Sequence, residues 1–246
     1  MATSTIHSQF DDLAKLYENM ATWPFRRDIE IPSVLEAVGD VKGQDVLDFG
    51  CGDGTYSRIL KERGARRVMG FDEADGMLRH ARNRERDDAL GIEFVSQLGP
   101  ELDQQFDLVL GVYVLPYASD IRALERMCAN MKRLLRPGGR LVTLPIHPQY
   151  VADPAYYKPY GFSLTQIPPH QDGGSVKLDL FHSGYIGTVT AWYWSAASLD
   201  SALHAAGFEH VDHRNPMPSA LKSVERSPEI LRAYLSKPHA VILHCR

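Results

Sequence analysis

Apolar and polar positions follow two different periods along the first 145 residues of the chain. Short, nearly uninterrupted apolar runs, which are typical of buried strands, span residues 45–49, 67–71, 92–95, 106–110 and 140–145. Segments whose apolar residues recur at three- and four-residue steps, which is typical of helices, span 10–17, 32–38, 56–63, 75–87 and 121–135. Because strands alternate with helices, the pattern predicts an α/β fold with a doubly wound, mostly parallel sheet.

The pattern changes at Pro148, where prolines and tyrosines become frequent. The stretch 148–174 holds five prolines and four tyrosines: Pro148, Pro154, Pro159, Pro168, Pro169, Tyr150, Tyr156, Tyr157 and Tyr160. Such a stretch is too rich in proline for a regular core element, so we expect an insertion that covers one face of the sheet. Two alternating strands, a helix and a last strand are then expected over 175–179, 185–194, 198–206 and 240–244.

Composition and charge narrow the class of protein. The 246 residues are 44% hydrophobic and 24% charged, as in globular domains, and their net charge is −4. A slight acidic excess does not suit a protein that grips phosphate backbones, so nucleic acid is not an expected partner. The three cysteines are far apart and predict neither a disulfide framework nor a metal site. With no membrane-length apolar stretch and no secretory signal, a cytoplasmic protein without a membrane partner is expected.

The clearest chemical signal directly follows the first expected strand. In the run VLDFGCGDGT (46–55), glycines 50, 52 and 54 separate this strand from the next helix. Such a turn lets a ligand approach the backbone at the carboxyl end of a strand, next to a helix N-terminus. The spacing is not G-x-G-x-x-G, because residue 55 is Thr, and no G-K-[ST] phosphate loop follows. We therefore expect a ligand that contacts the backbone closely but carries no pyrophosphate.

Asp72 ends the second strand of the predicted sheet, about 20 residues after the glycine turn. A lone acidic residue after a strand could simply cap the next helix. At this distance from a glycine turn, however, its carboxylate is placed to accept hydrogen bonds from the two vicinal hydroxyls of a ribose.

Four motifs, in this order, resemble those of class I methyltransferases that use S-adenosylmethionine. They are VLDFGCGDGT, GFD followed by Met77, FDLVLGVYVLPY and LLRPGGRLV, and they cover about residues 40–145. The resemblance implies a Rossmann-like fold, S-adenosyl-L-methionine as cofactor and S-adenosyl-L-homocysteine as product. It also implies one domain over 1–246, divided into lid helices (1–40), a cofactor-binding half (41–147), a substrate-covering insertion with its strands after the fifth strand (148–195) and a C-terminal helix with strands (196–246).

The resemblance implies roles for individual residues. The methionine part of the cofactor is expected beside Asp48 and the glycine turn, the ribose on Asp72 and the adenine beside Met77. The full set expected to bind the cofactor is Tyr17, Asp48, Gly50, Gly52, Gly54, Asp72, Glu73, Met77, Gln97, Leu98 and Gly111. One position departs from the family pattern. Many members carry an Asp after Phe94 that contacts the adenine, whereas this chain has Gln97 and Leu98 nearby, so backbone groups are expected to substitute.

The segment after the fourth strand narrows the acceptor. Amino-methylating DNA enzymes resemble [DNS]-P-P-[YFW] here, whereas this chain has LGVY at 110–113. Cytosine C5 enzymes need a nucleophilic cysteine beside a proline, and none of Cys51, Cys128 and Cys245 fits. Together with the acidic balance, this leaves a small molecule as the expected substrate and a protein side chain as the less favoured one.

Over nearly its full length the chain resembles the toxoflavin-synthase-like group of small bacterial methyltransferases. The segments that carry this resemblance are FDDL at 10–13, QFDLV at 105–109, Tyr113 with Tyr117, and WYWS at 192–195 ahead of AGF at 206–208. It implies methylation of a ring nitrogen in a small aromatic heterocycle of a secondary-metabolite pathway. Carbon methylation of an electron-rich ring such as indole is the alternative, and a cofactor-binding regulatory module without turnover is a third hypothesis.

Two residues are candidates for catalysis. His147 follows the fifth strand, and an imidazole with its ordinary pKa of about 6.5 could take a proton from a ring N–H. Tyr113 follows the fourth strand. The aromatic acceptor is expected to contact Trp23, Phe25, Tyr117, His182 and Trp192. For the last of these, core packing is the simpler interpretation. The protein is expected to be a monomer or a homodimer.

Overall fold

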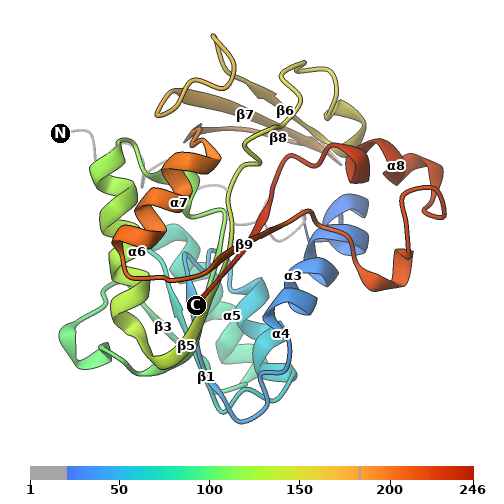
Figure 1. Cartoon of the computed structure of the whole chain (residues 1–246). Coiled ribbons are helices and arrows are strands. Elements are labelled where there is room, and N and C mark those ends of the chain that lie inside the picture. Colours follow the sequence, from blue (N-terminus) through green and yellow to red (C-terminus); the bar gives the residue numbers. More distant parts are fainter. Residues whose placement is uncertain (1–20, 183) are drawn as a thin grey trace.

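The computed structural model describes residues 21–182 and 184–246, and a seven-stranded sheet forms the centre of this part of the chain (Figure 1). Its strands lie in the order β3-β2-β1-β4-β5-β10-β9. They are β1 (Asp45–Phe49), β2 (Arg67–Phe71), β3 (Glu93–Val95), β4 (Phe106–Val112), β5 (Leu135–Leu144), β9 (Val211–Arg214) and β10 (Ile242–Cys245). Strands β1 to β5 pair in parallel, whereas β10 is antiparallel to both β5 and β9. The expected doubly wound, mostly parallel sheet is therefore confirmed.

Helices cover both faces of this sheet, and successive strand residues alternate between them. Val46 and Val142 belong to the core on one face, whereas Leu47 and Leu141 belong to the core on the other. The first face is covered by α3 (Ile31–Val38), α4 (Thr55–Glu62) and α5 (Asp75–Asp88), and the second by α6 (Ile121–Leu134) and α7 (Ala196–Ala205). Burial on both faces explains why these strands have apolar runs rather than alternating sequences.

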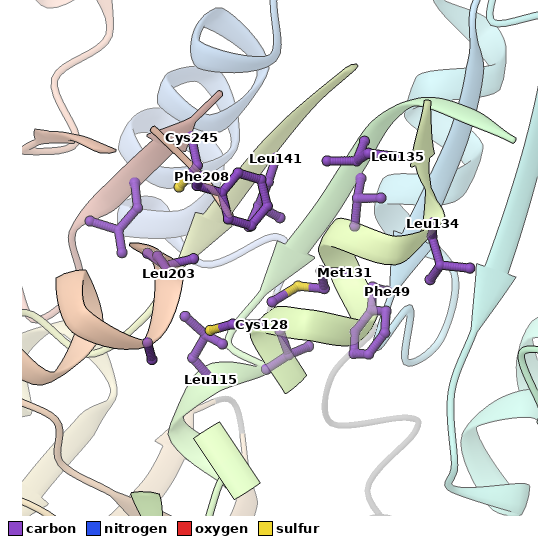
Figure 2. Packing of buried hydrophobic residues seen from close by; sticks show 14 of the residues in the cluster. Phe49, Leu115, Cys128, Met131, Leu134, Leu135, Leu141, Leu203, Phe208 and Cys245 are labelled. Atoms are coloured by element: carbon purple, nitrogen blue, oxygen red, sulfur yellow. The ribbon is translucent and has the colours of Figure 1, made fainter. Parts of the chain in front are cut away.

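Figure 2 shows the core on the side of α6 and α7. Cys128, Met131 and Leu134 recur at helical spacing along α6, so their side chains share the face that meets the sheet. Phe49 from β1 and Leu203 from α7 pack in the same cluster. Each fully buried side chain of this size contributes about 1.5 to 3 kcal/mol of transfer free energy. This cluster therefore fixes the strands whose carboxyl ends carry the glycine turn and the segment after β4.

A second, smaller sheet is built by the insertion. It holds β6 (Phe162–Thr165), β7 (Ser175–His182) and β8 (Tyr185–Trp192), all antiparallel, and it lies at the top of Figure 1 with α8 (Glu229–Ser236) beside it. A separate aromatic core joins this sheet and α8 to Trp23, Phe25 and the π-helical turn η1 (Arg26–Glu30). The insertion therefore has a hydrophobic core of its own.

The structure differs from the sequence-based expectations in three places. Strand β6 lies inside the proline-rich stretch, where no regular element is expected; four residues free of proline are enough for it, because they pair with β7. Strand β9 has exposed, mostly polar residues and so carries no clear apolar period. Helix α8 is also not among the expected elements, although its buried residues Leu231, Tyr234 and Leu235 recur at helical spacing. The expected helix over 10–17 lies outside the described residues. No helix among the described residues combines the length and the apolar character needed to cross a membrane.

Candidate functional site

A cavity of about 370 Å³ opens at the carboxyl ends of β1, β2 and β4. Its walls come from the glycine turn after β1, the residues after β2, the segment after β4 and one face of α6. Carboxyl ends of parallel strands are where ligands bind in open α/β sheets. The expected residues that line this cavity are Asp48, Gly50, Gly52, Asp72, Glu73, Met77, Tyr113 and Tyr117.

The glycine turn wraps tightly over the end of β1. The backbone N–H groups of Gly50 and Cys51 both donate to the carbonyl of Phe71, at 2.7 and 2.8 Å. Gly50 and Gly52 have φ of 74° and 55°, in the left-handed region that favours glycine. A Cβ on Gly50 would overlap Val114 Cγ1, whereas a Cβ on Gly52 would meet open space. The turn therefore leaves bare backbone exposed to the cavity at residue 52.

Asp72 forms the floor of the cavity beside this turn. Its Oδ2 accepts from the Gly52 N–H at 2.8 Å and its Oδ1 from the Ala74 N–H at 2.9 Å. These bonds fix the carboxylate, and its oxygens keep capacity to accept hydrogen bonds from a ligand. Burial raises the pKa of Asp72 above its ordinary value. A ligand with two adjacent hydroxyl groups would satisfy both oxygens.

Asp48, at the end of β1, is a second buried carboxylate in the cavity wall. Its side chain is 2% exposed, and its Oδ2 accepts from Ser57 Oγ at 2.6 Å. Burial raises the pKa of Asp48 to about 7, against the opposing effect of the Ser57 hydrogen bond, and the carboxylates of Asp53 and Asp72 raise it further. Nearby carboxylates favour a cationic ligand at this end of the cavity.

Tyr113, in the segment after β4, lines the cavity and has an unusual backbone. Its φ is 57°, which is rare for a residue with a side chain and commonly marks a functional site. This conformation directs the hydroxyl toward Glu30, to which it donates, and toward His239 Nε2 at 3.1 Å. Burial lowers the pKa of His239 to about 3, so its ring is neutral. Tyr117 lines the cavity close to Tyr113 in the chain.

Four residues expected to contact the cofactor do not line the cavity. They are Gly54, Gln97, Leu98 and Gly111. Gly54 begins α4, and a Cβ there would lie 2.8 Å from Phe94 Cζ, so its role is close packing. Gln97 is exposed, and the carbonyl of Leu98 accepts from Arg133 at 3.3 Å. Gly111 is buried within β4, where its carbonyl accepts from Thr143 Oγ1.

The structure also corrects the expected aromatic contacts to the substrate. Trp23 and Phe25 are 0% and 2% exposed and belong to the core of the insertion, with Phe25 at 5.1 Å from the ring of Phe162. Trp192 packs against the core beneath α6 and α7. Among the described residues of 148–195, none lines the cavity. The described part of the insertion therefore does not form the cavity wall, because its aromatic side chains pack in the insertion's own core.

His147 lies outside the cavity, contrary to its expected place beside the acceptor. Both ring nitrogens are engaged: Nε2 is 3.0 Å from Asn215 Oδ1, and Nδ1 accepts from the Gln149 N–H at 2.9 Å. Burial lowers the pKa of His147, which would further weaken it as a proton acceptor. These contacts assign His147 to the packing of the segment after β5.

His147→Ala is therefore expected to leave the rate of methyl transfer within about twofold of the unmodified protein. The reason is that its ring nitrogens contact Asn215 and the Gln149 N–H, and His147 is not among the residues that line the cavity. Initial rates measured at saturating cofactor test this. A general base at this position would instead cost about 10²-fold or more, and a loss of that size with unchanged cofactor affinity would restore His147 to the site.

Two expected site residues are not assigned to the cavity. Tyr17 lies outside the described part of the chain, and for His182 only the backbone, in β7, is described.

A buried ion pair at the cavity wall was not predicted from the sequence. Arg26 lines the cavity and is 7% exposed, and its Nε donates to Glu30 Oε1 at 2.8 Å. The two residues are four positions apart, which is the helical spacing of an ion pair, and they interrupt an apolar segment. This spacing of opposite charges within an apolar segment is the sequence signal from which the ion pair could have been predicted.

Comparisons with known proteins agree with this geometry. Residues 46–139 match a family described as a methyltransferase domain. The N-demethylindolmycin N-methyltransferase of Streptomyces griseus is 28% identical over 181 residues, which cover 71% of this chain and 74% of the relative. A demethylmenaquinone methyltransferase of Clavibacter sepedonicus is 29% identical over 219 residues, which cover 85% and 84% of the two chains.

A solved structure extends the comparison to the fold. The CcbJ methyltransferase from Streptomyces caelestis superposes with a TM-score of 0.66 at 17% identity, covering 97% of both chains. At this identity the likeness concerns the fold alone.

Proposed function

We propose, from the premise that this chain is a class I S-adenosylmethionine-dependent methyltransferase, that it methylates a ring nitrogen of a small aromatic heterocycle. The observation that carries the proposal is one continuous cavity whose wall includes both Asp72 with the glycine turn and the aromatic pair Tyr113 and Tyr117. A cofactor and an acceptor held in these two parts would lie next to each other. The resemblance to toxoflavin-synthase-like enzymes, and a relative named as an N-methyltransferase, support nitrogen as the accepting atom.

The donor set of the cavity fits S-adenosylmethionine. Asp72 offers two fixed acceptors to a ribose, and Met77 offers an apolar contact to an adenine. Bare backbone at Gly52 leaves room for close approach, and Asp48 supplies negative charge beside a cationic sulfonium. When bound, the cofactor supplies a methyl group on a sulfonium that is already activated as a leaving group.

Because the methyl group is activated, the chain's own contribution is to position the acceptor and to exclude water. The rings of Tyr113 and Tyr117 provide aromatic surface for a flat acceptor. The Tyr113 hydroxyl donates to Glu30, so this ring is held in one orientation. Tyr113 therefore remains a candidate catalytic residue, because its ring would align the accepting nitrogen with the methyl group. His147 is no longer a candidate.

The proposal is tested by incubating the protein with labelled S-adenosylmethionine and a panel of purines, pteridines and indoles, with mass spectrometry locating the added methyl. We expect methylation on a ring nitrogen. Each accepted compound is paired with its analogue in which that nitrogen is already methylated, and the analogue should be inert. Methyl transfer to the blocked analogue would instead establish carbon methylation. Transfer to no heterocycle of the panel would contradict the proposed acceptor class.

A further inference from the structure

Arg26 places a buried positive charge in the cavity wall. Its side chain is 7% exposed and lines the cavity together with Tyr56 and Asp53, at the end where the glycine turn leads into α4. Burial, the largest single effect, lowers the pKa of Arg26, but the charges of Glu30, Tyr56, Tyr113 and Asp53 together outweigh it and raise the pKa above its ordinary value. The guanidinium is therefore a permanent cation at the part of the cavity assigned to the methionine portion of the cofactor.

Glu30 holds this guanidinium by one edge. The Arg26 Nε–H donates to Glu30 Oε1 at 2.8 Å, and the same oxygen accepts from the Tyr56 hydroxyl at 3.4 Å. The other oxygen of Glu30 accepts from the Tyr113 hydroxyl. Three donors, all from side chains that line the cavity, thus converge on a carboxylate that is itself 0% exposed and does not line it. Because Glu30 engages Nε, the terminal Nη groups are the part of the guanidinium that a ligand in the cavity would engage.

The charges around the cavity indicate which ligand group these donors meet. Asp48, Asp53 and Asp72 surround the glycine turn and favour the cationic sulfonium and ammonium of the cofactor. The α-carboxylate is the one anionic group of S-adenosylmethionine, and it would be repelled by those aspartates. Arg26 is the buried cation among the described residues that line the cavity; Arg126, on α6, lines it too but is exposed.

We propose that Arg26 binds the α-carboxylate of the cofactor and that Glu30 is the positioning residue that aims the guanidinium at it. The inference rests on the proposed function only in using the same cofactor end of the cavity, and it makes no use of the acceptor. An arginine held through Nε presents its two Nη groups as a fork, which matches the two oxygens of a carboxylate.

The test compares two ligands that differ in one group. S-adenosylhomocysteine carries the α-carboxylate, and 5′-(3-aminopropylthio)-5′-deoxyadenosine is the same molecule without it. Calorimetry should show that the unmodified protein binds the first about 10- to 100-fold more tightly than the second, as expected for a buried charged hydrogen bond. Arg26→Met should remove most of this preference while leaving the affinity for the decarboxylated ligand nearly unchanged.

Arg126→Met is the matched control, because it removes an arginine from the same cavity without touching the buried pair. It should keep the full preference. If Arg126→Met loses the preference and Arg26→Met keeps it, or if Arg26→Met weakens both ligands equally, the proposal is wrong. Equal binding of the two ligands by the unmodified protein would also overturn it. Methyl transfer to an acceptor is not measured here, so failure of the proposed acceptor class leaves this test intact.

Two further variants separate positioning from folding. Arg26→Met leaves Glu30 buried without its partner, which could unfold the protein, so the double variant Arg26→Met with Glu30→Gln removes both charges together. It should fold and show the same loss of preference. Glu30→Gln alone keeps the side-chain shape but loosens the hold on Nε, and it should retain part of the preference. If Glu30 served only to stabilise the fold, Glu30→Gln would lower the thermal stability and leave the ratio of the two affinities unchanged.

Discussion

Asp72→Ala is expected to weaken the binding of S-adenosylhomocysteine by about 10²- to 10³-fold, because the variant loses two charge-assisted hydrogen bonds to the ribose. Asp72 also holds the N–H groups of Gly52 and Ala74, so part of the loss comes from the loop. Calorimetric titration measures the affinity directly. Asp75→Ala, which removes an exposed carboxylate three residues further along in the first turn of α5, should bind normally.

The ribose contribution can be separated from the loop contribution by changing the ligand. The unmodified protein should prefer 5′-methylthioadenosine over its 2′,3′-dideoxy analogue, and Asp72→Ala should bind the two equally. Asp72→Asn keeps one acceptor oxygen, so its preference for the ribose hydroxyls should lie between those of the unmodified protein and Asp72→Ala. Should Asp72→Ala keep the preference for the ribose hydroxyls, the assignment of Asp72 to the ribose would be wrong.

The second large effect concerns stability. Asp48→Asn is expected to make the ligand-free protein more stable at pH 8 by about 4 kcal/mol, since each unit of pKa shift corresponds to about 1.4 kcal/mol. Burial raises the pKa of Asp48 from 3.8 to about 7. Between these two values the folded protein keeps a proton that the unfolded chain has lost. The stability contributed by this group is therefore full below about pH 4, falls as the pH rises and is lost above about pH 7.

Urea unfolding of the ligand-free protein at pH 5 and pH 8 checks this sign. The advantage of Asp48→Asn should shrink by more than half at pH 5, because Asp48 is then largely protonated. Asp87→Asn, an exposed position near the end of α5, should show no such pH dependence. If the stabilities of Asp48→Asn and the unmodified protein run parallel from pH 5 to pH 8, the raised pKa of Asp48 is not real.

The parts of the fold that were predictable from sequence are those whose signal is local. Strands buried on both faces give apolar runs, and the bounds expected for β1 and β2 match the structure residue for residue. The glycine turn and Asp72 were also predictable, because the turn directly follows the first strand and Asp72 ends the second strand about 20 residues later. These features need no knowledge of which distant segments touch.

The unpredicted part of the site depends on such distant contacts. Tyr113 meets Glu30 across 83 positions of sequence and His239 across 126. The period of apolar residues along the chain does not indicate which distant residues will contact each other. Trp23 and Phe25 were recognisable as aromatic, but their core forms only when β6, β7, β8 and α8 assemble around them. His147 follows β5 as expected, and it is the Asn215 contact that turns its ring from the cavity.

His239 is the point where the cavity wall meets the core of the insertion. Its ring contacts Tyr113 on one side and Phe25, Phe162 and Tyr234 on the other. The described part of the insertion supports the cavity wall from behind. It does so through His239, through Tyr117, which packs against the same core, and through Trp194, whose Nε1–H donates to the carbonyl of Ala118 at 3.3 Å. A change in the packing of this core is therefore expected to reach the cavity as a shift of its wall, without any change in a residue that would touch a ligand.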